Sequence, residues 1–159
     1  MKTYNILFLC THNSARSVIG EALASTHASG KLIGFSAGST PGTSVNPFAA
    51  EIAKELGHDT SKLRSKNWDE FSLPDAPQMD FIITVCDDAA GEQCPFWPGK
   101  PATAHWGFPD PSKVQGSDLE KKAAFIQVMN GLKRRIDLLA SMPLERLDSI
   151  SLKEIHSKA

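Results

Sequence analysis

The sequence predicts an α/β fold of three layers, an open and mostly parallel four-stranded sheet with helices on both faces. Two continuous apolar runs, YNILFL from Tyr4 and FIITV from Phe81, are typical of strands buried on both sides of a parallel sheet. Segments of strand character alternate along the chain with amphipathic helical patterns. This alternation favours the fold because parallel strands must be joined by crossover segments, most often helices.

The elements of the first half each have a local signal. The first helix should follow the first strand and end by Gly30, and a second strand is predicted over Leu32–Ser36. Asn46 can cap the next helix, Pro47 suits its first position and Gly57 can terminate it.

The second half continues the alternation. We expect a short helical turn around Asn67–Phe71 and a last strand over Ala102–Trp106. Ser117 and Glu120 have the spacing of a capping box, which predicts a long helix, and an amphipathic segment should follow Leu144. The apolar stripe predicted for the long helix is Leu119, Ala123, Ile126, Met129, Ile136 and Leu139.

Length and composition set the broad class. The chain has 159 residues, a net charge of −1, 41% hydrophobic and 22% charged residues, which predicts one domain over residues 1–159. This charge excludes a strongly basic nucleic-acid-binding surface, and the apolar runs are too short to span a membrane. With no export pattern at the start, we expect a cytoplasmic protein whose three cysteines form no disulfide framework.

The segment Cys10–Ser17 joins the first strand to the first helix and has the features of an anion site. A thiol there faces the positive end of the helix dipole, and Arg16 offers a planar fork for a tetrahedral oxyanion. Such surroundings lower the pKa of a cysteine to about 3.5–7.5, from about 8.5, so Cys10 is a candidate nucleophile. The alternative is a small buried side chain at a strand end. The residues expected to bind the anion are Thr11, His12, Asn13, Ser14, Ala15, Arg16 and Ser17.

The other two cysteines follow the strand that begins at Phe81. Cys86 lies at its carboxyl end, and ligands of open parallel sheets bind beyond that edge, where Cys10 also lies. Cys94 lies in the loop rich in Gly and Pro that follows. Either cysteine could be structural, but their placement favours a redox role.

Several motifs resemble known proteins. Cys10-x5-Arg16-Ser17 resembles the phosphate loop of low-molecular-weight protein tyrosine phosphatases, and Asp110-Pro111 resembles their general-acid loop. Within that superfamily the chain is more similar to the thiol-dependent arsenate reductases. Ser36-Ala37-Gly38 resembles the end of the second strand in the phosphatases, and the segments similar to the reductases in order and spacing are Ile83–Asp87, Cys94-Pro95 and His105–Pro111.

The resemblance implies a reductase that acts in arsenical resistance and detoxification. Cys10 would form an adduct with arsenate, for which phosphate competes, while Arg16 stabilises the charge and Asp110 protonates the departing hydroxyl. Cys86 would then attack Cys10 and expel arsenite, and Cys94 would move the disulfide to the loop. Thioredoxin, or glutathione with glutaredoxin, would reduce it. No dinucleotide fingerprint is present, so we expect no cofactor.

Two other functions remain open. A low-molecular-weight phosphatase would use Cys10, Arg16 and Asp110 without the other cysteines, although Ser112 and Lys113 stand where those phosphatases carry aromatic residues. A module that only binds oxyanions or thiophilic metals would use the cysteines as ligands.

A cation position is also implied by the resemblance. Asn13, Glu21 and Ser36 match positions that hold potassium in some of these reductases, and Lys66 falls near the fourth ligand. Its ammonium could take the place of the cation, so we predict no required metal. Asn13 should order the loop through hydrogen bonds to the loop backbone. Three histidines are expected on the surface: His27, His58 and His156.

Overall fold

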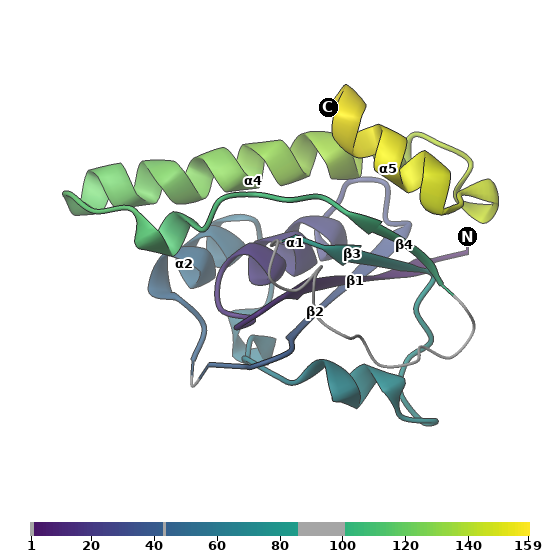
Figure 1. Cartoon of the computed structure of the whole chain (residues 1–159), viewed down its shortest axis with the longest axis horizontal. Helices are drawn as coiled ribbons and strands as arrows, with labels where there is room; N and C mark the ends of the chain where they lie inside the picture. The colour runs from purple at the N-terminus through teal and green to yellow at the C-terminus, as the bar shows by residue number, and fades with distance from the viewer. Residues whose placement is uncertain (1, 43, 86–100) are drawn as a thin grey trace.

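The computed structural model describes residues 2–42, 44–85 and 101–159, whose chain order alternates strands and helices (Figure 1). Within the described ranges, α1 lies between β1 and β2 and α2 between β2 and β3, as the apolar patterns predict. The elements are β1 (Tyr4–Cys10), α1 (Arg16–Ser25), β2 (Leu32–Gly38), α2 (Pro47–Glu55), η1 (Thr60–Lys62), η2 (Trp68–Ser72), β3 (Phe81–Thr84), β4 (Ala102–His105), η3 (Pro111–Lys113), α4 (Asp118–Ala140), η4 (Leu144–Arg146) and α5 (Ser149–Lys158).

The sheet has four strands in the order β2-β1-β3-β4, and each neighbouring pair is parallel. This confirms the predicted sheet. The chain leaves β1 toward β2 on one side and returns to β3 on the other, so a crevice opens where β1 ends. Cys10 is the last residue of β1 and pairs in register with Gly38 at the end of β2.

The two faces of the sheet are covered differently. Ile6, Phe8 and Ile83 belong to the larger core cluster, together with buried residues of α1, α2, α4 and α5. On the opposite face, Leu7 and Leu9 belong to a second cluster with the side chains of η2. Figure 1 shows α4 and α5 on one side of the strands and η2 on the other. Helices thus cover both faces, as predicted.

Two helix starts confirm their sequence signals. The side chain of Asn46 accepts from the backbone N–H of Phe48, with Pro47 in the first turn of α2. Ser117 and Glu120 form both halves of a capping box at the start of α4. Each cap satisfies backbone N–H groups that have no partner inside the helix.

The predicted stripe of α4 is wrong in its first half. Leu119 is 79% exposed because the amino end of α4 extends past the sheet (Figure 1), and Ile126 is exposed because the buried face passes through its neighbour Phe125. The buried face includes Phe125, Val128, Leu132, Ile136 and Leu139. Within the described ranges, no helix is both long and apolar enough to cross a bilayer.

Candidate active site

Cys10 lies at the centre of a short chain of hydrogen bonds. The thiol is buried, the backbone N–H of Asn13 donates to its Sγ over 3.2 Å, and Ser17 Oγ lies 2.9 Å from the same atom. The side-chain amide of Asn13 donates to Ser17 Oγ over 2.8 Å. Ser17 thus accepts from Asn13 and has its own hydrogen to donate to the sulfur. This direction favours the thiolate of Cys10.

A backbone N–H fixes which groups donate and which accept in this series of hydrogen bonds. Asn13 Oδ1 accepts from the backbone N–H of Lys66 over 3.0 Å, so the amide nitrogen of Asn13 must point toward Ser17. We predicted that Asn13 would bond to the backbone of its own loop. Its side chain instead connects the loop to the segment at Lys66, 53 positions away.

The loop between β1 and α1 turns its carbonyl groups away from the thiol. Four successive carbonyls accept hydrogen bonds from outside the loop. Across a trans peptide the next N–H points the opposite way, so the amides of residues 12–15 face the inner side of the loop. These amides form an anion nest at the start of a helix. The bonds run from Thr40 N to Thr11 O, Gly42 N to His12 O, Ser65 Oγ to Asn13 O and Asn46 N to Ser14 O.

Two backbone features make this loop possible. Asn13 has a φ of 50°, in the left-handed region that asparagine tolerates better than most residues. Gly38 lies so close to the loop that a Cβ would come within 2.5 Å of Thr11 O. The glycine of Ser36-Ala37-Gly38 is therefore required by the close approach of β2 to the loop.

Arg16 is held at the mouth of the loop by the segment after β4. Its Nη1 donates to the carbonyl of Phe108 over 2.8 Å, and its Nη2 lies 3.7 Å from Asp110 Oδ2. The structure thus brings the nucleophile loop and the predicted acid together at one edge of the sheet. Arg16 can bind an oxyanion beside Cys10 while keeping a carbonyl and a carboxylate as partners.

The resting Asp110 is a carboxylate rather than an acid. Burial raises the pKa of Asp110. Two other effects lower this pKa and outweigh burial: hydrogen bonds from the hydroxyl and N–H of Ser112, and the positive charges of Arg16 and Lys113. An anion bound in the loop would oppose this shift, because like charges raise the pKa of a carboxyl group.

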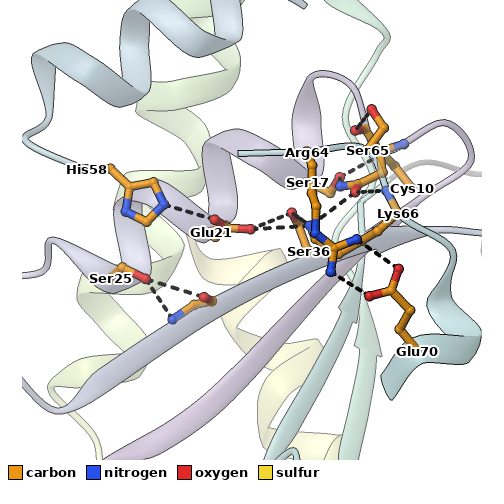
Figure 2. A network of polar contacts seen from close by, with 12 residues as sticks. Cys10, Ser17, Glu21, Ser25, Ser36, His58, Arg64, Ser65, Lys66 and Glu70 are labelled. Carbon is orange, nitrogen blue, oxygen red and sulfur yellow. Dashed lines mark hydrogen bonds and ion pairs between the residues drawn. The ribbon is translucent and has the colours of Figure 1, made fainter. Parts of the chain in front are cut away.

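A buried cluster behind the loop includes Lys66, Glu21 and Ser36 (Figure 2). Lys66 Nζ donates to Ser36 O over 2.8 Å and lies 3.4 Å from Asn13 Oδ1, 3.4 Å from Ser36 Oγ and 3.8 Å from Glu21 Oε1. Burial lowers the pKa of Lys66, whereas the charges of Glu21 and Cys10 act to raise it.

This cluster settles whether the side chains suit a metal ion. The oxygens of Asn13, Ser36 and Glu21 form a donor set of the kind that binds a hard cation. The ammonium of Lys66 already lies among them, so the residues do not fit a further cation. Within residues 2–42, 44–85 and 101–159, no three His, Cys, Asp or Glu side chains are grouped to hold a metal.

Three histidines expected on the surface are half-buried and paired. His58 Nε2 lies 2.9 Å from Glu21 Oε2, His27 Nε2 lies 2.9 Å from Asp137 Oδ1, and His156 accepts from Arg135. The prediction was wrong because polar neighbours in sequence do not reveal partners that are distant in sequence. Of these, His58 adds to the site, since it bonds the carboxylate beside Lys66 (Figure 2).

The predicted redox residues Cys86 and Cys94 lie in 86–100, outside the described residues. His12 is exposed, with its Nδ1 3.0 Å from the carbonyl of Thr40. The described part of the site therefore comprises the anion loop, Arg16 and Asp110.

Comparisons with known proteins agree with this geometry. The family model for the low molecular weight phosphotyrosine protein phosphatases matches residues 5–150. A curated arsenate reductase of Halalkalibacterium halodurans is 38% identical over 135 residues, 85% of this chain and 94% of the relative. A solved structure of an arsenate reductase in the phosphate binding state has a TM-score of 0.64 and 26% identity, covering 87% of this chain and 98% of that one. The Corynebacterium glutamicum thioredoxin-dependent arsenate reductase has a TM-score of 0.55 and 29% identity, over 86% of this chain and 63% of its own.

Proposed function

We propose that this chain, which belongs to the low molecular weight phosphotyrosine protein phosphatase family, reduces arsenate to arsenite. The observation that carries the proposal is the hydrogen-bond chain that ends on Cys10 Sγ inside a loop of inward-facing amides. The curated relative at 38% identity is an arsenate reductase, which favours arsenate over a phosphate ester as the substrate.

In the first step the Cys10 thiolate attacks arsenic, and one hydroxyl of arsenate leaves as water. Arg16 and the loop amides stabilise the negative charge that develops on the remaining oxygens. The charge of the bound oxyanion raises the pKa of Asp110, so this carboxylate can take up a proton from water when the oxyanion binds and deliver it to the leaving hydroxyl. Phosphate has the same shape and charge and competes for the loop.

In the second step Cys86 attacks Cys10 Sγ. A Cys10–Cys86 disulfide forms, the bond from Cys10 to arsenic breaks, and its electron pair leaves with arsenite. Arsenic is reduced by two electrons, and the two thiolates are oxidised by two. Cys94 then attacks Cys86, which restores Cys10 and leaves a Cys86–Cys94 disulfide.

An external reductant, either one dithiol or two monothiols, reduces this disulfide and closes the cycle. We propose thioredoxin, or glutathione with glutaredoxin, as that reductant, and the thioredoxin-dependent relative supports the first. The protein needs no cofactor because its own thiols supply the electrons. We further propose that residues 1–159 act as one domain in the cytoplasm, where such reductants keep thiols reduced.

Lys66 acts as the resident cation of the site. Its ammonium holds Asn13 Oδ1 and neutralises Glu21, so the loop keeps its shape without an alkali ion. Exchanging sodium for potassium at constant ionic strength should therefore leave arsenate turnover unchanged. A clear dependence on potassium would contradict this role.

The test is arsenate-dependent NADPH consumption, with thioredoxin or with glutathione and glutaredoxin as the recycling system. Cys10→Ser and Cys86→Ser should abolish turnover with both systems, and Cys94→Ser should abolish it with thioredoxin. Full activity of Cys10→Ser would refute the mechanism. Full activity of Cys94→Ser with glutathione would show that the relay uses only Cys10 and Cys86.

The same variants separate the other functions. A phosphatase would hydrolyse an aryl phosphate and tolerate Cys86→Ser, because hydrolysis needs no second thiol. A binding module would hold arsenite or zinc stoichiometrically and show no turnover. If the protein did not reduce arsenate, hydrolysis of the aryl phosphate would identify it as a phosphatase, and stoichiometric binding without turnover would identify it as a binding module.

A further inference from the structure

Phe108 contacts the anion site through its backbone rather than its side chain. Its carbonyl accepts from Arg16 Nη1 over 2.8 Å, and its N–H donates to the carbonyl of Val85 over 3.1 Å. The position of the guanidinium at the mouth of the loop therefore depends on where the Phe108 peptide is held. The bond from its N–H to Val85 holds the peptide on the amino side of Phe108, and packing of the ring holds the Cα from which the carbonyl extends.

The ring of Phe108 lies in a pocket formed by two helices. A Cβ at Gly131 of α4 would lie 2.5 Å from its Cε1, so the ring packs directly on the backbone of that helix. The guanidinium carbon of Arg135 lies 4.8 Å from the ring centroid, and the ring of His156 meets it edge-on at 6.2 Å. Contacts on several sides leave the ring little freedom to move.

The last helix completes this pocket. Arg135 is buried, its Nε donates to His156 Nδ1 over 2.8 Å and its Nη1 donates to the carbonyl of Gly131. The indole N–H of the fully buried Trp106 donates to Leu152 O over 2.9 Å. Helix α5 thus bonds both α4 and the segment that leads into Phe108, and Figure 1 shows it beside the end of α4. Residues 151–158 of this helix lie beyond the part that the family model matches.

We propose that Phe108 is a positioning residue for Arg16, and that Gly131, Arg135 and His156 hold its ring so that its carbonyl orients the guanidinium toward the bound oxyanion. The C-terminal helix is then part of the oxyanion site, although it touches no substrate. Because this role concerns anion binding at the site of the proposed function, it is measured by anion affinity, separately from turnover.

Gly131→Ala is the most direct test. The added methyl group displaces the ring and with it the carbonyl, although alanine favours a helix more than glycine does. We expect the KM for arsenate to rise about tenfold, since a hydrogen bond to a charged group is weakened. Asn130→Ala, at an exposed neighbouring position of α4, is the control for helix propensity and should keep the wild-type KM.

Two variants of His156 test the same role without a steric change at α4. His156→Gln keeps an acceptor for Arg135 and should retain anion affinity, whereas His156→Leu removes the acceptor and should weaken it. The affinity is measured as protection of Cys10 from iodoacetamide by phosphate, followed by mass spectrometry of the Cys10 peptide. A melting temperature of each variant shows whether it is folded.

The outcomes separate the proposal from a purely structural role. Lower melting temperatures with unchanged phosphate protection and unchanged KM, in Gly131→Ala and His156→Leu, would overturn it. If the wild-type protein binds phosphate at Cys10 but does not reduce arsenate, the proposed function fails and the role of Phe108 is still measured by protection.

Discussion

The two sides of the oxyanion site are built by different forces. Behind the nucleophile loop, a buried set of polar and charged side chains connects Lys66 to Cys10 through hydrogen bonds (Figure 2). Around Arg16, the Asp110 carboxylate is one partner and the other is the Phe108 carbonyl, whose position depends on packing of the Phe108 ring. The first side sets the charge and reactivity of the thiol, and the second sets where the guanidinium lies. Substitutions should therefore change reactivity on one side and anion affinity on the other.

Lys66→Met should have the largest effect, because it leaves the buried Glu21 without its cation. Breaking one partner of a buried ion pair costs about 3–5 kcal/mol, which we expect as a loss in the free energy of unfolding measured with urea. The arsenate kcat should fall as well, since Asn13 loses one contact of its Oδ1.

The double variant Lys66→Met with Glu21→Gln is the matched control. It removes both charges, so much of the lost stability should return. If Lys66→Met alone were as stable as wild type, the cluster would not depend on the ammonium.

Ser17→Ala should have the next largest effect, through the sulfur and through the Asn13 amide that loses its acceptor. It removes the hydroxyl that lies 2.9 Å from Cys10 Sγ and should lower the rate of Cys10 alkylation at neutral pH about tenfold. The alkylation profile should move to higher pH, because the thiolate is less stabilised.

Ser14→Ala is the control, since Ser14 lies in the same loop and accepts from the N–H of Asn46 through its backbone carbonyl, which alanine keeps. Its alkylation profile should match that of wild type. Equal profiles for Ser17→Ala and wild type would contradict the direction of the hydrogen-bond chain.

Asp110→Asn should act on the side of the oxyanion site that surrounds Arg16. The variant keeps the shape of the side chain but cannot donate a proton as an acid, so kcat for arsenate should fall more than phosphate affinity. The negative charge beside Arg16 is also lost, which should leave phosphate binding equal to or tighter than in wild type.

The same variant should change acid stability with a defined sign. The pKa of Asp110 is lowered in the folded protein, so its charge stabilises the fold above the unfolded value of about 3.9 and this gain is lost as the pH falls through the folded value. Asp110→Asn should therefore be less sensitive than wild type to acid in that window, as measured by thermal melting. Equal acid sensitivity would show that Asp110 is not held as a carboxylate.

What the sequence could predict follows from distance along the chain. Cys10 and Ser17 are 7 positions apart, so a strand end, a loop and a helix start were enough to indicate the anion site. The bond from Arg16 to Phe108 spans 92 positions, and no local pattern in either segment contains it. The ammonium at Asn13 was expected only from the resemblance to a family, since buried lysines are rare.

The errors have the same origin. Polar neighbours in sequence suggested that His58 and His156 were on the surface, but their partners Glu21 and Arg135 lie 37 and 21 positions away. Helical periodicity alone allows two neighbouring apolar stripes on α4 and does not show which one other helices cover, so Ile126 is predicted to be buried where Phe125 is. Tertiary contacts decide both questions.

The smallest effect on stability should come from protonation of His156. This protonation tests the packing around the Phe108 ring without a substitution near Arg16. Burial lowers the pKa of this imidazole first, and the charges of Arg135 on α4 and His105 on β4 lower it further. The neutral ring accepts from Arg135 Nε, and protonation at Nδ1 would remove that acceptor. The stability from this group is complete above the unfolded value of about 6.5 and is lost as the pH falls through the lowered folded value. Wild-type melting temperatures should fall across that range more steeply than those of His156→Gln, which does not titrate there, whereas parallel curves would show that α5 is held independently of this histidine.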